Sequence, residues 1–189
     1  MPHLSRQKTI DAAPRPPEIL ETERLRLRPA RVADAEAIFA AYAQDPEATR
    51  YLTWAPHRSV EETRQFLVFC EEEWEKDSSY PWVILDKESG ELLGMIHLSI
   101  RGHRADLGYV LARPHWGKGI MTEAGRAVVD WALAQDSIYR VWAVCDVENL
   151  ASARVMEKLG MQREGVLRRW IRRPNCDTPR DCYCYAIVK

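Results

Sequence analysis

The most informative segment of this chain is Arg113-Pro-His-Trp-Gly-Lys-Gly-Ile-Met-Thr-Glu-Ala124. It follows a strand-like run, Asp106–Ala112, and opens an amphipathic helical stretch. A strand, a turn with two glycines and a helix start together form a concave row of backbone N–H groups, and the helix N-terminus adds partial positive charge. Gly117 and Gly119 allow a ligand to approach the backbone closely, and Lys118 between them offers a cation. The stretch therefore predicts a site for a phosphate or pyrophosphate group.

Two common phosphate motifs do not fit this turn. The P-loop of nucleotide hydrolases needs a glycine five positions before Gly117 and a serine or threonine after Gly-Lys, where this chain has Ala112 and Gly119. The dinucleotide-binding fingerprint needs a further glycine three residues after Gly119, and that position holds Thr122. Both nucleotide-binding interpretations are therefore excluded.

Two further motifs accompany the turn. Asn149-Leu-Ala-Ser-Ala-Arg-Val-Met-Glu-Lys-Leu-Gly-Met161 follows it along the chain, and Glu21-Thr-Glu-Arg-Leu-Arg-Leu-Arg-Pro29 precedes it. Together with Trp116–Ala124, these segments resemble the GNAT superfamily of N-acetyltransferases. They resemble most the branch that contains the RimJ/RimL-type ribosomal-protein N-terminal acetyltransferases. The resemblance extends from Leu20 to Lys189.

The resemblance implies an α/β fold with α+β element order. Three layers are expected, in which helices flank a mixed central sheet that splays between its fourth and fifth strands. Hydrophobic periodicity and turn residues predict the individual elements. The expected strands are Arg24–Arg28, Tyr80–Leu85, Glu91–Ile100, Asp106–Ala112, Ile138–Cys145, Gln162–Ile171 and Asp181–Val188. The expected helices are Arg31–Asp45, one that starts at the capping box Ser59-Val-Glu-Glu62, Thr122–Gln135 and Ala151–Leu159.

Composition limits the remaining classes of protein. A chain of 189 residues suits one domain, predicted at residues 20–189 behind a loose tail at residues 1–19. The net charge of −1 gives no global basic field, so direct nucleic-acid and membrane binding are not expected. No apolar run approaches the roughly 18 residues that span a bilayer. The five cysteines lack CxxC spacing, which favours a reducing, cytoplasmic location and no metal.

By resemblance, the ligand of the turn is acetyl-CoA. The backbone of Leu111, Ala112 and Arg113 would bind the pantetheine arm, with Asn149 on the opposite side. The pyrophosphate would be wrapped by Trp116, Gly117, Lys118, Gly119, Ile120 and Met121. Ser152 would also lie at the cofactor, and Arg154 would reach the nucleotide end. As alternatives, Asn149 is a helix N-cap, Arg154 a solvated cation and Trp116 a plug against the core.

The family transfers the acetyl group directly, which requires an acid for the departing thiolate and a base for the amine. Many members carry a tyrosine where this chain has Met156, which cannot donate a proton. Ser152, one turn earlier, is the predicted acid, with helix capping as its alternative. Asp106 is the predicted base, and Asp146 is the first alternative. Other candidates are less favoured: His97 and His103 as bases and Cys145 as an acyl carrier.

The predicted acceptor is a primary amine, either a protein N-terminal α-amine or a small molecule. Its rim is expected at Tyr51–His57, Tyr80, Trp82 and Trp170–Asp177. Trp54, in the first of these segments, is alternatively a core residue, and Arg172 and Arg173 in the last face either a carboxylate or solvent. A different class of function is a non-catalytic acyl-CoA sensor. The protein is expected to be a monomer or a homodimer.

Overall fold

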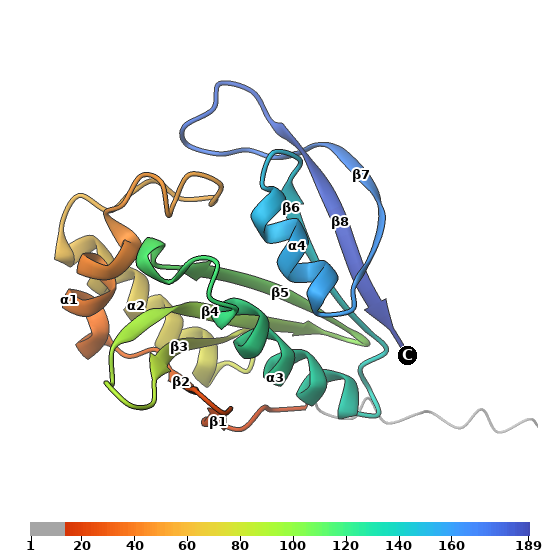
Figure 1. Ribbon diagram of the computed structural model, residues 1–189, viewed down its shortest axis with the longest axis horizontal. Coiled ribbons are helices and arrows are strands. Elements are labelled where there is room, and N and C mark those ends of the chain that lie inside the picture. The colour runs from red at the N-terminus through yellow and green to blue at the C-terminus, as the bar shows by residue number, and fades with distance from the viewer. Residues whose placement is uncertain (1–13) are drawn as a thin grey trace, which may run out of the picture.

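The computed structural model describes residues 14–189, so residues 1–13 of the predicted tail lie outside the described part. One eight-stranded sheet runs through the molecule in the order β1-β2-β3-β4-β5-β6-β8-β7 (Figure 1). All neighbouring strands are antiparallel except β5 and β6, which are parallel. The strands are β1 (Leu20–Glu21), β2 (Leu25–Pro29), β3 (Tyr80–Asp86), β4 (Leu92–Arg101), β5 (Arg104–Leu111), β6 (Arg140–Asp146), β7 (Gln162–Ile171) and β8 (Arg180–Val188).

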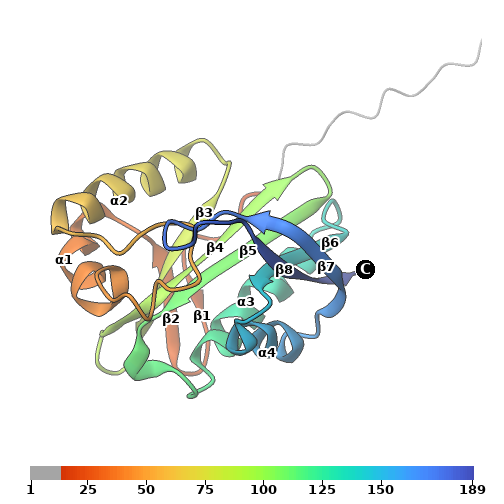
Figure 2. The same ribbon diagram turned by 90° about the horizontal axis from the view of Figure 1, so that it is seen from above.

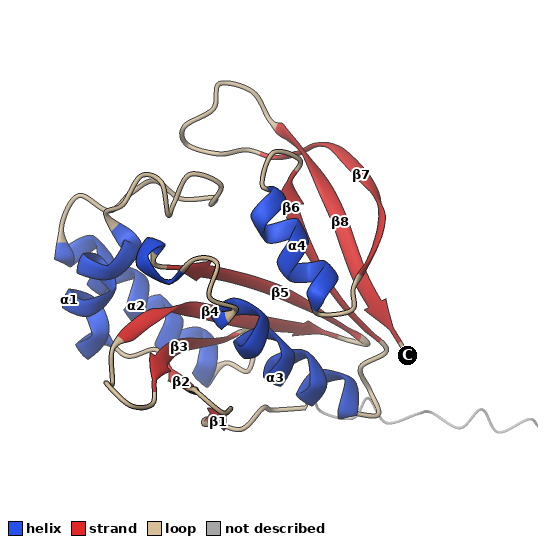
Figure 3. Cartoon of the chain, in the orientation of Figure 1, coloured by secondary structure: helices blue, strands red, loops and turns tan. Residues whose placement is uncertain are grey.

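Helices cover both faces of the sheet, which confirms the predicted mixed α/β layering. Figures 1 and 2 show α1 and α2 on one face and α3 and α4 on the other, and Figure 3 separates the helices from the strands by colour. The α-helices are α1 (Ala35–Ile38), α2 (Val60–Glu75), α3 (Ile120–Ala134) and α4 (Leu150–Lys158). Short 3-10 turns lie at Val32–Asp34 and Arg113–His115. None of the helices among residues 14–189 is long and apolar enough to cross a membrane.

The first predicted helix is not a single α-helix. A 3-10 turn leads into the one-turn helix α1, and the π-helical segment Phe39–Ala43 follows. The Asp34 carboxylate accepts the N–H of Arg31 at 2.8 Å and pairs with Arg28, which fixes the start of the segment. The buried side chains Ile38 and Tyr42 hold its inner face against the sheet. Tertiary contacts therefore override the regular periodicity expected from the sequence.

Two other helix signals are confirmed. The Ser59 Oγ accepts the N–H of Glu62 at 3.4 Å, so Ser59 is the N-cap of α2 as predicted, while the Glu62 carboxylate accepts the N–H of Arg58 at 2.8 Å in place of that of Ser59. Gly160 follows the C-cap of α4 with φ of +86°, a conformation that favours glycine.

The predicted splay lies between β5 and β6. These are the fourth and fifth strands of the prediction. The numbering differs by one because the two-residue strand β1 is too short to give a sequence pattern and was not predicted. Their parallel pairing contains three pairs, Arg104 with Arg140, Ala105 with Val141 and Asp106 with Trp142. Beyond Asp106 the strands diverge (Figure 1), and the rest of β5 has no neighbour on that side.

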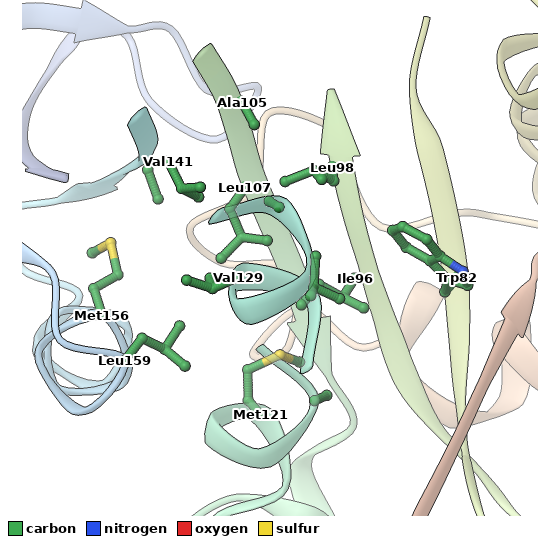
Figure 4. Close-up of a cluster of buried hydrophobic side chains, with 14 of the residues drawn as sticks. Trp82, Ile96, Leu98, Ala105, Leu107, Met121, Val129, Val141, Met156 and Leu159 are labelled. Carbon is green, nitrogen blue, oxygen red and sulfur yellow. The ribbon is translucent and has the colours of Figure 1, made fainter. Parts of the chain in front are cut away.

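Two hydrophobic clusters fill the layers on either side of the sheet. In the cluster between the sheet and α3 and α4, Val129 of α3 and Met156 and Leu159 of α4 lie near the β5 residue Leu107 (Figure 4). A Cβ on Gly125 would lie 2.9 Å from the Leu159 side chain, so glycine permits the close approach of α3 and α4. The other cluster packs the α1 and α2 layer against β3 and β4.

The described part of the predicted tail contacts the domain. Arg15 forms an exposed ion pair with Asp77 at 2.8 Å, and the Trp82 Nε1–H donates to the carbonyl of Glu18 at 3.2 Å. Trp82 and Tyr80 are fully buried beside Trp74. The prediction that these two β3 residues line the acceptor rim is therefore wrong, because both side chains belong to the core.

Candidate active site

The loop between β5 and α3 presents a row of free backbone donors. Gly117 and Gly119 both have φ of +76°, so the two glycines carry the left-handed conformations that curve the loop. The N–H groups of residues 117–121 donate to no acceptor among residues 14–189. The start of α3 adds its partial positive charge at the same place. This geometry suits an anion with several oxygens, as the sequence indicated.

Neighbouring side chains hold the loop in this shape. The Trp116 Nε1–H donates to the carbonyl of Leu111 at 2.7 Å, so this half-exposed indole ties the loop to the end of β5. Arg24 reaches the carbonyl of Lys118 at 3.3 Å and also pairs with Glu123 on α3. The loop is therefore braced before any ligand arrives.

Arg113, at the base of the loop, pairs with Asp45 in the segment between α1 and α2. Lys118 forms no ion pair within the described part of the chain, which leaves its exposed ammonium available at the donor row.

The unpaired edge of β5 supplies a second set of backbone groups. The Ala112 N–H donates to the carbonyl of Leu93 at 2.8 Å, and its own carbonyl accepts from His115 at 3.0 Å. Alternation in an antiparallel ladder then turns the backbone groups of Tyr109 and Leu111 away from β4 and toward the splay. Ala112 thus has no free backbone group for an extended arm, whereas the N–H groups of Tyr109 and Leu111 are free for one.

The first turn of α4 faces this edge across the splay. The Asn149 Oδ1 accepts the N–H of Ser152 at 3.1 Å, so Asn149 is the N-cap of α4 and Ser152 is not. The Ser152 Oγ lies 2.8 Å from the phenol oxygen of Tyr109. Tyr109 was not predicted from the sequence, because no motif marks a strand residue whose partner lies on a later helix. Arg154, farther along α4, is exposed and forms no ion pair within residues 14–189.

Asp106 and Ser152 lie on opposite faces of the sheet. Tyr109 and Leu107 point toward α3 and α4, so alternation places Asp106 on the α1 and α2 face, opposite Ser99 of β4. Burial raises the pKa of Asp106, and the charge of Arg101 offsets this only in part. A carboxyl with a raised pKa at the start of the splay can take a proton nearer neutrality than an ordinary aspartate.

His97 lies on the same face as Asp106, over Gly108. A Cβ at Gly108 would come within 2.2 Å of the His97 ring, so the glycine makes room for the imidazole. Burial lowers the pKa of His97 and keeps the ring neutral.

Asp146, the alternative base, forms ion pairs with two arginines. The carboxylate is almost fully buried and pairs with the buried Arg173 at 2.7 Å and with Arg180 at 3.1 Å. Burial would raise the pKa of Asp146, but hydrogen bonds from Arg180 and the N–H of Glu148, together with the charge of Arg173, outweigh it and lower the pKa. Asp146 is therefore a structural anion and a weak base.

Arg173 joins three segments that are distant in sequence. Besides Asp146 at the end of β6, it contacts the loop between α1 and α2, where its Nη1–H donates to the carbonyl of Arg50 at 2.8 Å and its guanidinium lies 5.1 Å from the centroid of the Tyr51 ring. Arg173 itself belongs to the loop between β7 and β8 and is only 4% exposed. Of the two alternatives for Arg173, the solvent-facing one is wrong, because its guanidinium is buried against the Asp146 carboxylate, whereas its neighbour Arg172 is exposed.

An open hollow of about 530 Å³ lies where these two loops meet. Its lining is Thr53, Arg172, Arg173, Pro174, Cys176 and Asp177. The hollow thus includes parts of two of the predicted rim segments. Trp54, from the same loop, packs against the second core cluster and lies 4.9 Å from the ring of His57, so the core interpretation holds for this tryptophan.

Four of the five cysteines are buried, and Cys176 is partly exposed. All five cysteines are free thiols, and no group of three or more metal-binding side chains lies together within residues 14–189. Burial raises the pKa of Cys145 to about 12, although a hydrogen bond with Ser152 opposes this. Its thiol is protonated at neutral pH and therefore a poor nucleophile.

Comparison with known proteins identifies the family. The model of the acetyltransferase (GNAT) domain matches residues 24–162. The uncharacterized N-acetyltransferase YoaA of Bacillus subtilis is 36% identical over 174 residues, which cover 90% of this chain and 97% of YoaA. The ribosomal protein uS5-alanine N-acetyltransferase of Escherichia coli is 26% identical over 161 residues, which cover 80% of this chain and 82% of that enzyme.

The fold agrees with solved structures. RimL, a ribosomal α-N-protein acetyltransferase in complex with coenzyme A, matches with a TM-score of 0.81 at 23% identity, over 90% of this chain and 98% of that chain. The chain belongs to the GNAT acetyltransferase family and is an N-acetyltransferase, and its similarity to the ribosomal-protein acetyltransferases is consistent with the RimJ/RimL-like branch.

Proposed function

We propose that the protein transfers the acetyl group of acetyl-CoA directly to a protein N-terminal α-amine. The observation that carries the proposal is the free backbone edge of β5, which lies between the donor loop and the first turn of α4. One relative in sequence acts on ribosomal protein uS5, and one structure of similar fold, a ribosomal α-N-protein acetyltransferase, was solved with coenzyme A. The phosphates of acetyl-CoA would bind the N–H groups of the donor loop, and its thioester arm would bind the N–H groups at the edge of β5.

The donor loop would hold the pyrophosphate. The free N–H groups of Gly117, Lys118, Gly119, Ile120 and Met121 form the contact, and the Lys118 ammonium adds charge. Trp116 contributes by holding the loop, because its backbone N–H donates to the carbonyl of Arg113 and its indole N–H donates to the carbonyl of Leu111. In this proposal Arg113 helps to hold the base of the loop, and Arg154 reaches the nucleotide end.

The β5 edge and α4 would flank the reacting thioester. The N–H groups of Tyr109 and Leu111 replace the missing neighbour of β5 by binding the arm, and Asn149 retains its amide N–H donors for the opposite side. Backbone donors at this edge can also stabilise the developing oxyanion, an effect worth roughly 3–4 kcal/mol per donor in other enzymes. Ser152 is the proposed acid for the departing thiolate, and Asp106 is the proposed base for the amine, reached through the splay.

The hollow beside Arg173 is the proposed entry of the acceptor. It is open and lined mostly by polar and charged groups, which suits the first residues of a polypeptide. Five free thiols accord with a reducing, cytoplasmic location, which forms part of the proposal.

The test measures release of the coenzyme A thiol from acetyl-CoA with a panel of amines. The panel contains peptides that begin with Ala, Ser, Thr or Met, the same peptides with blocked N-termini and an internal lysine, polyamines and aminoglycosides, and mass spectrometry locates the acetyl group. Acetylation confined to free peptide N-termini is the expected result. Turnover with small amines alone would replace the proposal by a small-molecule acetyltransferase. Binding of acetyl-CoA without transfer to any amine would favour the sensor.

A further inference from the structure

We propose that Tyr109 is a positioning residue for the departure of the coenzyme A thiolate. Its phenol would donate to the Ser152 Oγ and so direct the serine hydroxyl hydrogen toward the sulfur. The inference rests on the proposed function, since it assigns a partner to the acid of that reaction. No feature of the sequence connects the two residues, which lie 43 positions apart.

The contact between Tyr109 and Ser152 allows two arrangements of their hydroxyl hydrogens. The Tyr109 phenol oxygen lies 2.8 Å from the Ser152 Oγ and 3.2 Å from the Ser152 carbonyl oxygen. When the phenol donates to Oγ, the serine hydrogen points away from the phenol and can go to a third group, either the neighbouring Cys145 sulfur or an incoming thiolate. When the phenol donates to the carbonyl, the serine hydrogen is used on the phenol. A negative sulfur in the splay binds only the first arrangement and therefore selects it.

The position of Tyr109 compensates for a residue that α4 lacks. Met156, one turn after Ser152 on the same helix, is fully buried in the core and has no donor (Figure 4). The phenol instead comes from β5 and reaches the first turn of α4. The N-terminus of that helix also favours negative charge on a nearby atom. A phenol and a hydroxyl thus meet where the splayed edge of β5 faces α4.

The protonation states suit a donor. Burial raises the pKa of Tyr109 far above its ordinary value, and the hydrogen bond with Ser152 reverses only part of this, so the phenol keeps its proton throughout the working range. Cys145 of β6 is the other titratable group beside the pair, and its raised pKa keeps it a neutral thiol. On α4, Glu157 is engaged by the Tyr185 phenol at 2.9 Å. The described residues therefore present one uncharged donor chain, from Tyr109 to Ser152.

The amine nitrogen forms a bond to the acetyl carbon, the carbon–sulfur bond breaks, and its electron pair stays on sulfur. The Ser152 hydroxyl gives its proton to that sulfur, and the Tyr109 hydrogen bond stabilises the charge that develops on the serine oxygen. The proton lost by the amine reaches solvent through the base, and one solvent proton restores the serine. The products are the amide and the coenzyme A thiol.

Four variants test the assignment: Tyr109→Phe, Ser152→Ala, the double variant and Tyr185→Phe. Tyr185→Phe is the matched control, because it removes another buried phenol that binds α4 but does not touch Ser152. Loss of a hydrogen bond to a developing charge predicts that Tyr109→Phe lowers kcat about 10- to 100-fold with an unchanged KM for acetyl-CoA. The double variant should match Ser152→Ala alone, because Tyr109 acts through the serine. A kcat of the double variant that is lowered by the product of the two single losses would overturn the proposal.

A second readout needs no acceptor. Coenzyme A labelled with 13C at the carbon beside its sulfur is bound to each variant, and the thiol is titrated by NMR. In the wild type and in Tyr185→Phe, the pKa of the bound thiol is expected to be lower than that of free coenzyme A. In Tyr109→Phe and Ser152→Ala, it is expected to be higher than in the wild type. Equal titration of wild type and Tyr109→Phe would refute the positioning role. Failure of the amine panel alone would remove the proposed function, and this titration would still decide the role of Tyr109.

Discussion

The two ends of the active site are built differently. The cofactor half, defined as residues 109–121 and the first turn of α4, consists of free backbone donors, and the local contact of Trp116 with Leu111 holds their loop together with the more distant brace from Arg24. The acceptor half, defined as residues 44–59 and 172–179, is held by the buried pair of Arg173 and Asp146. Arg173 also reaches the carbonyl of Arg50, 123 positions away. The cofactor half is thus specified by a short motif, whereas the acceptor half depends on single long-range contacts.

The comparison predicts that removing Arg173 damages stability most. Arg173→Met leaves Asp146 buried with Arg180 as its remaining charged partner, so a loss of about 3 kcal/mol is expected, at the low end for a broken buried pair. Urea unfolding measures the effect. Arg172→Met is the matched control, since the neighbouring side chain is exposed, and it should change stability by less than about 0.5 kcal/mol. Equal midpoints for the two variants would contradict the role of the pair.

The same variant should change the response to acid. The folded-state pKa of Asp146 is lowered from an ordinary value of 3.8, so the stability it contributes is fully present above that pH and is lost as the pH falls through the folded pKa. Arg173→Met removes one cause of the lowered pKa. Acid unfolding followed by circular dichroism should therefore begin at a higher pH in the variant than in the wild type. An unchanged acid midpoint would show that Arg180 alone sets the pKa.

The next largest effect is expected at the base, which lies between the two halves. Asp106→Asn should lower kcat about 100-fold or more, because a general base typically contributes roughly 10²–10⁴-fold. Since the pKa of Asp106 is raised and the base must be ionised, activity should rise with pH along a limb above the ordinary carboxyl range. That limb should be absent in the variant. Persistence of the limb in Asp106→Asn would transfer the role to another group, of which the neutral His97 is the nearest on that face.

A smaller effect is expected from backbone strain in the cofactor half. Gly119→Ala places a side chain at φ of +76°, which costs about 1–2 kcal/mol, and the nearest atom to the new Cβ, the Arg24 Nη2, is 3.7 Å away. Relief of the strain would move the donor row, so coenzyme A should bind about tenfold more weakly. Gly102→Ala is the control, because Gly102 has φ of +62° in the turn at the other end of β5. Calorimetry should find its affinity unchanged, and equal losses would exclude a specific role of the loop.

The smallest effect is expected at Arg154. This exposed cation on α4 forms no ion pair among residues 14–189, so Arg154→Ala should weaken acetyl-CoA binding only a few-fold, and less in high salt. Lys76→Ala on the opposite face of the sheet serves as the control. An unchanged affinity at low salt would remove Arg154 from the nucleotide site.

The two halves also differ in how far the sequence predicts them. The donor loop, the N-cap Asn149 and the end of α4 at Gly160 follow from residues adjacent in the chain, whose conformational preferences act locally. The splay between β5 and β6 followed from the family resemblance. Short-range patterns of this kind survive in the folded protein because tertiary contacts reinforce them.

Features that depend on distant partners were not predictable. The burial of Arg173 requires Asp146 of β6 and a carbonyl in the loop between α1 and α2. No spacing in the sequence predicts that these groups come into contact. The Tyr109 phenol likewise acquires its role only when α4 lies across the splay. Aromatic composition was misleading for Tyr80 and Trp82, which fill the core.

The most direct test of this account is an amide NMR titration of the protein with coenzyme A. The largest shifts are expected at the N–H groups of residues 117–121, Tyr109 and Leu111, while residues 44–59 and 172–179 should change little. The largest shifts in those two acceptor-half segments, with an unchanged donor loop, would contradict the assignment of the cofactor half.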